Sequence, residues 1–253
     1  MTAPPLVLVL RLLLLLLLVL VCPPRCCATT TAILLLLLAN PPPHFKYRDE
    51  IDLTNLVAMK PLFKAAGETA GVKVSYMPFL LKGLSLALLD FPQVNASFDP
   101  VKEELRQHGH HHIGVAMDTP RGLLVPHIKD VQSKSVIEIA ADLNRLQRLG
   151  AENKLGEAEL VGATTVVSNM GSIGGTYMSP VITPPQVSIC ALGKIERVPK
   201  FKSPDSDEVV AAHVMGAAWA ADHRVLDGAT VARFCNKWKL YLENPEVMAM
   251  HMK

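Results

Sequence analysis

The stretch that decides the fold spans residues 221–228 and reads ADHRVLDG. It follows an apolar segment that is typical of a strand and precedes a helix that we expect to begin near Ala229. His223 therefore falls where a strand ends and the chain turns, a frequent position for a catalytic group held by a rigid scaffold. A histidine can take and return a proton near neutral pH, and a thiol with a pKa of ~8.5 is a suitable proton donor.

The spacing of this motif leaves two interpretations open. His223 is a catalytic base, or it satisfies backbone groups at a turn while Asp222, Arg224 and Asp227 form local ion pairs. Spacing alone favours the turn. The choice therefore depends on the other motifs that the chain carries.

A glycine-rich stretch at residues 168–176, SNMGSIGGT, forms the second constellation. Ser168 is expected at the end of a strand, where a hydroxyl can donate to a developing oxyanion. The alternative is an ordinary glycine-rich loop. The stretch is not a phosphate-binding loop, because no Gly-Lys-Ser/Thr follows it. Ser168 is not expected to be a nucleophile, because no G-x-S-x-G pattern surrounds it.

Four histidines gather at positions 108, 110, 111 and 112. Adjacent histidines can bind a metal, but no cysteine or carboxylate framework at zinc-ligand spacing accompanies them. We therefore interpret them as a polar loop that enters a strand at His112, and we expect no metal site.

Outward from these motifs, strands and helices alternate from His44 to the C-terminus without an internal repeat. The clearest helix covers 136–149, with a capping box formed by Ser135 and Glu138 and with Gly150 as its end. The last helix has one apolar face and ends before residue 245; that face carries Val231, Phe234, Trp238 and Leu242.

The remaining expected elements are shorter or less regular. A helix over 51–66 would be kinked or shortened by Pro61, and a second, buried helix covers 78–89. Strands are expected over 112–117, 123–125, 164–167, 187–192 and 213–219, with a turn over 118–122. Such intermixed elements predict an α/β fold of the two-layer α+β kind, a mixed sheet covered by helices.

The charge of the chain argues against one class of partner, and its cysteines indicate the kind of compartment. The net charge is +2, and no basic stripe with interleaved aromatic residues is present, so we expect no nucleic-acid partner. Cys190 and Cys235 are isolated in apolar stretches, which favours free thiols in the core and a reducing compartment.

Residues 1–43 form a leucine- and proline-rich segment of low complexity. It is interpreted either as a signal or membrane segment or as the product of a misassigned first exon, and the globular domain is expected over 44–253. On a secretory route, Asn95-Ala96-Ser97 would become a glycosylation sequon.

Together these motifs resemble the catalytic domain of the 2-oxoacid dehydrogenase acyltransferases. The segments that carry the likeness are His44-Phe45, 49–53, 77–79, Phe91-Pro92, 113–118, 122–126, 168–171, Pro184-Pro185 and 222–228. Two segments are most similar to the branched-chain subfamily, namely SNMGSIGGTYMSPVITPP (168–185) and LNRLQRLG (143–150).

The resemblance implies a chloramphenicol-acetyltransferase-like fold, assembled as trimers that build a hollow cubic 24-mer. Its active site is then a channel at a subunit interface, which coenzyme A enters from one side and the dihydrolipoyl arm from the other. By resemblance His223 deprotonates the attacking thiol, Ser168 of a neighbouring subunit stabilises the oxyanion, and Asp227 fixes the local structure. The implied coenzyme A contacts are Lys60, Ser75, Asp118, Gln147, Ser168, Asn169, Gly193 and Ile195.

The implied reaction moves an acyl group, such as the branched 2-methylpropanoyl group, between a dihydrolipoyl thiol and coenzyme A. Implied partners are lipoyl domains, the dehydrogenase component and dihydrolipoamide dehydrogenase, in the mitochondrial matrix. An acetyl-transferring pyruvate dehydrogenase core remains an alternative, because one methylene changes specificity by only about 1–3 kcal/mol. A membrane-anchored or secreted protein that uses the leucine run is another.

Four features depart from the family pattern, and one of them is Pro61, which falls inside the next expected helix. Lys60 stands where the family commonly has arginine, which keeps the charge but loses the bidentate fork. We recognise neither the lipoyl domain nor the small subunit-binding domain that family members carry before the core, so the lipoyl group is expected on a separate domain. The leucine and proline run replaces the expected first core helix, so a truncated, non-catalytic assembly fragment is a further alternative.

Overall fold

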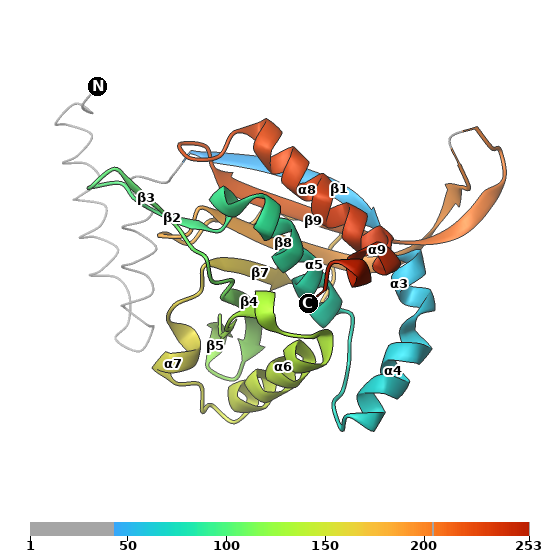
Figure 1. The fold of residues 1–253 in the computed structure, drawn as a ribbon, viewed down its shortest axis with the longest axis horizontal. Helices are drawn as coiled ribbons and strands as arrows, with labels where there is room; N and C mark the ends of the chain where they lie inside the picture. Colours follow the sequence, from blue (N-terminus) through green and yellow to red (C-terminus); the bar gives the residue numbers. More distant parts are fainter. Residues whose placement is uncertain (1–42, 204, 253) are drawn as a thin grey trace, which may run out of the picture. The chain divides into compact units, whose positions relative to one another are not determined.

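A mixed sheet with the strand order β1-β9-β8-β7-β4-β5 forms the centre of the protein, and β6 pairs with β4 (Figure 1). The computed structural model describes residues 43–203 and 205–252, and the predicted leucine- and proline-rich segment over 1–43 lies outside these residues except for Pro43. The strands are β1 (His44–Asp52), β4 (Ile113–Thr119), β5 (Gly122–Leu124), β6 (His127–Ile128), β7 (Thr165–Asn169), β8 (Ser188–Phe201) and β9 (Val209–Asp222). A separate hairpin is formed by β2 (Ala96–Asp99) and β3 (Glu104–Gln107).

The sheet combines both pairing modes. Strand β7 runs parallel to β4 and to β8, whereas β9 is antiparallel to β8 and to β1. This confirms the predicted mixed sheet.

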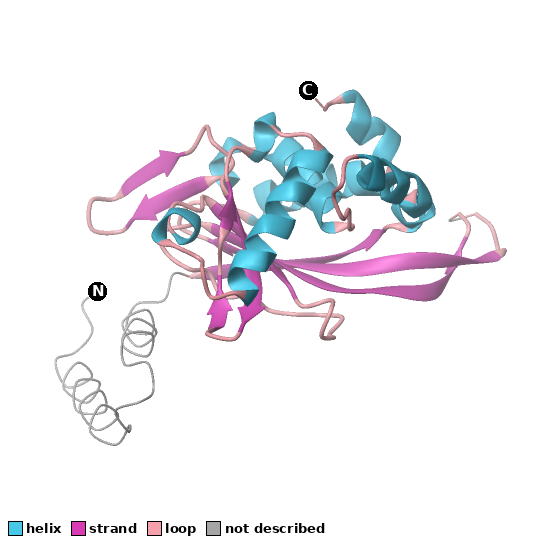
Figure 2. Ribbon diagram, turned by 90° about the horizontal axis from the view of Figure 1, so that it is seen from below, coloured by secondary structure: helices cyan, strands magenta, loops and turns pink. Residues whose placement is uncertain are grey.

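Helices lie against one face of this sheet (Figure 2). They are α3 (Thr54–Ala58), α4 (Lys60–Thr69), α5 (Met77–Asp90), α6 (Val136–Ala151), α7 (Glu157–Leu160), α8 (Gly228–Glu243) and α9 (Pro245–Met250), with 3₁₀ turns at Pro92–Val94 and Val131–Ser133. The predicted helices over 78–89 and 136–149 and the C-terminal helix are confirmed as α5, α6 and α8.

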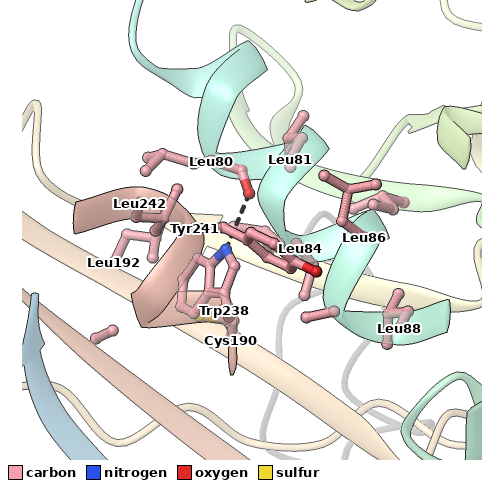
Figure 3. Packing of buried hydrophobic residues seen from close by; sticks show 14 of the residues in the cluster. Leu80, Leu81, Leu84, Leu86, Leu88, Cys190, Leu192, Trp238, Tyr241 and Leu242 are labelled. Atoms are coloured by element: carbon pink, nitrogen blue, oxygen red, sulfur yellow. Dashed lines mark hydrogen bonds between the residues drawn. The ribbon is translucent and has the colours of Figure 1, made fainter. Parts of the chain in front are cut away.

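The core lies between α5, α8 and the sheet. Every residue of α5 from Met77 to Leu88 is buried, which explains why its apolar residues occupy all faces. The predicted face of α8 packs against α5, where Trp238 Nε1 donates to the Leu80 carbonyl oxygen at 3.1 Å (Figure 3). Burial of these large side chains is the main favourable contribution to the fold.

One lysine in this core ties α5 to the segment before α6. Lys82 is fully buried, and its ammonium donates to the carbonyl oxygens of Gln132 and Lys134 at 3.1 and 2.7 Å. Burial lowers the pKa of Lys82. These bonds fix the start of α6 relative to α5.

The capping box predicted for α6 is present. The Ser135 hydroxyl accepts from the Glu138 backbone N–H at 3.3 Å, and the Glu138 carboxylate accepts from the Ser135 N–H at 2.8 Å. Gly150 does not end the helix as predicted. It is buried in the last turn of α6, which continues to Ala151.

The predicted helix over 51–66 is wrong at its start. Ile51 and Asp52 are the last two residues of β1. This strand pairs with β9 over nine residues, and these backbone bonds override the helical spacing of the side chains. Two short helices follow in place of one. Pro61 stands in the first turn of α4, where its missing N–H leaves no helical bond unmade.

Several strands extend beyond their predicted ends. Strand β4 includes Asp118 and Thr119, which were predicted as a turn. Strands β8 and β9 continue past the sheet as a long projecting hairpin (Figures 1 and 2), where they pair with each other alone. Outside the main sheet's core this segment lacks a continuous apolar pattern, which is why sequence periodicity missed it.

The sequon predicted at Asn95-Ala96-Ser97 is not accessible in the folded chain. Asn95 is fully buried, and its amide nitrogen donates to the carbonyl oxygens of His108 and His110 at 2.9 Å each. Across residues 43–203 and 205–252, helices of the length and apolar character needed to span a membrane are absent.

Candidate active site

The turn after β9 is held by an ion pair between a buried aspartate and an exposed arginine. The Asp222 carboxylate is 4% exposed, and the Arg224 guanidinium donates to both of its oxygens, with an Nη2–Oδ2 distance of 2.6 Å. The hydrogen bond to Asp222 raises the pKa of Arg224. The other side of this guanidinium lies 4.7 Å from the ring centroid of Phe98 on β2. The ion pairing that the turn interpretation expected between Asp222 and Arg224 is therefore present.

His223 itself is exposed at the end of β9. Its backbone N–H donates to the Pro43 carbonyl oxygen at 2.8 Å. Its ring meets the ring of Phe45 edge-on, with centroids 5.5 Å apart. A Cβ on Gly228 would lie 2.8 Å from Phe45 Cζ, so the absence of a side chain at this position makes room for Phe45.

Asp227 caps helix α8. Its carboxylate accepts from the Thr230 backbone N–H at 2.7 Å and from the Thr230 hydroxyl at 3.1 Å. The backbone hydrogen bond from Thr230 is the main cause that lowers the pKa of Asp227. The carboxylate thus starts the helix that follows the His223 turn.

Ser168 lies near the end of β7 and is partly exposed. The glycine-rich loop that follows packs directly on the sheet, because Cβ atoms on Gly193 and Gly216 would lie 2.7 and 2.3 Å from the Thr176 carbonyl oxygen. Asn169 fixes the start of the loop by accepting from the Gly171 N–H at 3.0 Å.

Ser168 and His223 lie at opposite ends of the sheet. Ser168 is in register with Ala191 on β8, and Ala191 is in register with Ala218 on β9. His223 follows Ala218 by five residues. At ~3.3 Å per residue and ~4.8 Å between strands, the two residues are separated by about 17 Å along the strands and about 10 Å across them. They cannot act on one substrate atom within a single chain.

Two hollows open beside Ser168. The large hollow has a volume of about 810 Å³ and is lined by residues from β4, α6 and β7 and by the loop that follows β7. The small hollow has a volume of about 280 Å³ and is lined by residues from α5, the loop after β7 and the middle of β8. Both hollows share the residues Ser75, Met77, Asn169 and Ser172.

The predicted coenzyme A contacts gather around these hollows. Ser75, Asp118, Gln147, Ser168 and Asn169 line the large hollow. Gly193 and Ile195 line the small hollow. Lys60 lines neither, but its ammonium lies 5.5 Å from the ring centroid of Tyr76, which lines the small hollow. Together the hollows reach the size of a site for an extended ligand.

The histidines at 108–112 form a loop between β3 and β4, as predicted. His111 is 3% exposed and shares a 2.7 Å hydrogen bond with the Ser85 hydroxyl, and burial lowers its pKa to about 4. Asp130 donates its backbone N–H to His112 Nδ1 at 3.1 Å. Within the described part of the chain, three or more histidine, cysteine or acidic side chains nowhere gather in a way that could hold a metal ion.

Sequence reasoning missed three residues around the site. Phe45 was noted only as part of a motif, although it contacts the His223 ring. Phe98 was missed because β2 was not predicted. Lys194 lies in β8 and lines the small hollow. Its position between the expected contacts Gly193 and Ile195 could have identified it from the sequence.

Comparison with known proteins places these features in a family context. The family model for 2-oxoacid dehydrogenases acyltransferase (catalytic domain) matches residues 29–250. The chain is 51% identical over 211 residues to the lipoamide acyltransferase component of the branched-chain alpha-keto acid dehydrogenase complex of Bos taurus, covering 83% of this chain and 43% of that protein. It is 39% identical over 208 residues to the dihydrolipoyllysine-residue acetyltransferase component of the pyruvate dehydrogenase complex of Bacillus subtilis, covering 82% and 46%. The chain thus spans less than half the length of these relatives.

Solved structures show the same fold. The cubic core of the pyruvate dehydrogenase multienzyme complex has a TM-score of 0.81 at 32% identity, covering 87% of this chain and 89% of that one. Dihydrolipoamide acetyltransferase of Azotobacter vinelandii, from work on a serine, a histidine and an asparagine in its catalytic mechanism, has a TM-score of 0.78 at 33% identity, covering 83% and 85%. A chloramphenicol acetyltransferase has a TM-score of 0.54 at 13% identity, covering 79% of this chain and 89% of that one. At this identity the likeness shows a common fold alone. The predicted fold class is confirmed.

Proposed function

The chain belongs to the 2-oxoacid dehydrogenase acyltransferases, in their catalytic domain, and from this premise we propose that it transfers an acyl group between a dihydrolipoyl thiol and coenzyme A. The acyl group is branched, such as 2-methylpropanoyl. The 51% identity to a branched-chain component, against 39% to an acetyl-transferring component, supports this choice.

His223 acts as the general base in this proposal. An unprotonated ring nitrogen takes the proton of the attacking thiol, and the resulting thiolate attacks the acyl thioester. The exposed position of His223 at the end of β9 leaves its ring open to a substrate. Phe45 limits the orientations of the ring from one side. The protonated ring then returns the proton to the departing thiolate, which leaves as the thiol.

Ser168 of a neighbouring subunit donates a hydrogen bond to the oxyanion. The separation of Ser168 and His223 in one chain supports an active site shared between two copies. Removing such a donor typically lowers kcat by a factor of about 10²–10³. Asp227 holds the base in place by capping α8 and takes no proton.

The observation that carries the proposal is the convergence of the expected coenzyme A contacts. Residues from α5, β4, α6, β7 and β8, far apart in the sequence, line two hollows that share four residues. The spacing of His223 and Asp227, four residues apart, equals that of the histidine and asparagine investigated in the Azotobacter vinelandii enzyme.

The partners follow from the same premise. The chain forms trimers that build a cubic core, and the structural likeness to a cubic pyruvate dehydrogenase core supports this assembly. The lipoyl group supplies the second thiol from a lipoyl domain, and the dehydrogenase and dihydrolipoamide dehydrogenase components associate with the core. The protein acts in the mitochondrial matrix, since the related Bos taurus protein is mitochondrial.

The decisive experiment measures acyl transfer from 2-methylpropanoyl-CoA to dihydrolipoamide by the purified chain. Transfer that is lost in His223→Ala supports the proposal, and full activity in that variant contradicts the mechanism. Acetyl-CoA as a parallel substrate distinguishes the acetyl-transferring alternative. An assembled particle in sedimentation without any turnover would show a non-catalytic core instead.

A further inference from the structure

The two hollows beside Ser168 differ in charge. Among the described residues that line the large hollow, only Asp118 is charged. Among those that line the small hollow, only Lys194 is charged. An elongated ligand with one anionic end therefore experiences attraction at one end of the site and repulsion at the other.

Coenzyme A is such a ligand, because its phosphates are all on the nucleotide end and its pantetheine arm is uncharged. We propose that Lys194, assisted by Lys60, binds these phosphates, so that the nucleotide lies at the small hollow and the thiol extends through the large hollow toward Ser168. This inference rests on the proposed function and adds a residue and a ligand orientation to it.

Lys194 is placed for this role by the backbone of β8. The pairing of β8 with β9 is irregular between Leu192 and Ile195, and the Lys194 N–H donates to the Gly175 carbonyl oxygen at 3.0 Å. This bond joins the irregular segment to the loop that follows Ser168. The position of Lys194 is thereby coupled to the wall between the hollows.

The ammonium of Lys194 can change its partner from the Glu196 carboxylate to a phosphate. It lies 3.6 Å from the Glu196 carboxylate, longer than a charge-assisted hydrogen bond of about 2.8 Å, and its side chain is 57% exposed. An exposed pair of this kind contributes little, so a phosphate can displace Glu196 at small cost.

Lys60 supplies a second positive charge on the same side. Its ammonium lies 5.5 Å from the ring centroid of Tyr76, and Tyr76 lines the small hollow between Ser75 and Met77. The first turn of α4, which begins at Lys60, contains no acidic residue. The two lysines thus approach the small hollow from α4 and from β8.

The orientation also agrees with the position of the reacting groups. Ser168 lines the large hollow only, and Asn169 lines both. The thiol must reach Ser168, so the arm occupies the large hollow, where Asp118 and Gln147 offer partners to its amide and hydroxyl groups. The reverse orientation would bring phosphates against Asp118.

The test measures coenzyme A binding by calorimetry to the full chain and the KM of pantetheine in the transfer assay. We expect Lys194→Ala to weaken coenzyme A binding about fivefold and to leave the KM of pantetheine, which has no phosphate, unchanged. Glu196→Gln should tighten coenzyme A binding about twofold by releasing Lys194. Rising salt should weaken binding less in Lys194→Ala than in the wild type.

Lys202→Ala is the matched control, because it also removes an exposed lysine paired with a glutamate, 2.8 Å from Glu208. It should change neither value. Wild-type coenzyme A binding that Lys194→Ala leaves intact, or an equal loss for pantetheine, overturns this inference alone. No coenzyme A binding by the wild type overturns the proposed function together with it.

Discussion

Phe45 packs edge-on against the ring of His223, with an interplanar angle of 86°. The two residues come from β1 and from the end of β9, the two strands that pair from His44↔Asp222 onward. The first strand of the domain thus sets the surroundings of the proposed base.

Replacing Phe45 should affect catalysis more than substrate binding. In Phe45→Ala the imidazole loses an aromatic contact of about 1 kcal/mol, so kcat should fall about fivefold while the KM for acyl-CoA stays the same. Phe45→Leu, which keeps most of the volume, should retain more activity. Steady-state kinetics check this, and a change confined to KM would contradict a positioning role.

Gly228→Ala should reproduce this defect from the other side of Phe45. The added Cβ would lie 2.8 Å from Phe45 Cζ, which forces the ring to move. Gly71→Ala, a position with open space around its Cβ but a φ of +67°, is a control for backbone strain without contact with the site. Kinetics and circular dichroism of both variants separate the two effects.

Arg224→Ala should destabilise the protein. It leaves the Asp222 carboxylate buried without its guanidinium, and since Arg224 is 36% exposed we expect a loss of about 2 kcal/mol, less than for a fully buried pair. Lys237→Ala removes a more exposed pair with Asp90 and should cost under ~1 kcal/mol. Urea unfolding at one fixed protein concentration measures both, and equal losses would refute the special role of the Asp222 pair.

The histidine loop should make stability depend on pH. Burial lowers the pKa of His111 to about 4, below the ordinary value of 6.5, so the unfolded chain binds more protons between these values. Stability from His111 is therefore complete well above pH 6.5 and declines as the pH falls toward 4, by about 3 kcal/mol. His108, His112 and His127 have pKa values lowered mainly by burial and act in the same direction.

A His111→Asn variant checks this dependence. Its unfolding free energy should be lower at pH 7 through loss of the Ser85 contact but should change less between pH 6.5 and pH 4. An unchanged slope in this variant would locate the pH dependence elsewhere.

Mixing two inactive variants should restore activity if the site is shared between copies. Ser168→Ala lowers kcat about 10²–10³-fold and His223→Ala abolishes transfer. Random assembly of equal amounts gives intact pairs at about a quarter of the interfaces. Activity of the co-refolded mixture is the measurement, and two variants that stay inactive together would place both residues in one chain's site.

Local signals predicted the helices better than the strands. The capping box at Ser135 and Glu138 is complete within four residues, so the sequence alone indicates the start of α6. Strand β1 carries mostly charged side chains, and its structure depends on β9, more than 150 residues away. The β8–β9 hairpin likewise depends on pairing that no local period encodes.

The site was predictable as a set of residue types but not as a geometry. Seven of the eight coenzyme A contacts implied by the family resemblance line the two hollows, whereas the catalytic roles of His223 and Ser168 stay predictions. The motifs could not show that Phe98 contacts Arg224, because that contact requires β2 to lie beside the turn after β9. They also gave no hint that His111 is buried within the histidine loop.

The placement of Ser168 and His223 at opposite ends of one sheet has a consequence for the life of the protein in the cell. Under the proposed mechanism a newly made subunit is folded but catalytically inactive, and turnover begins only when a second copy binds to it. Specific activity would then fall on dilution below the assembly constant. Enzyme assays of this protein would report quaternary structure as directly as sedimentation does.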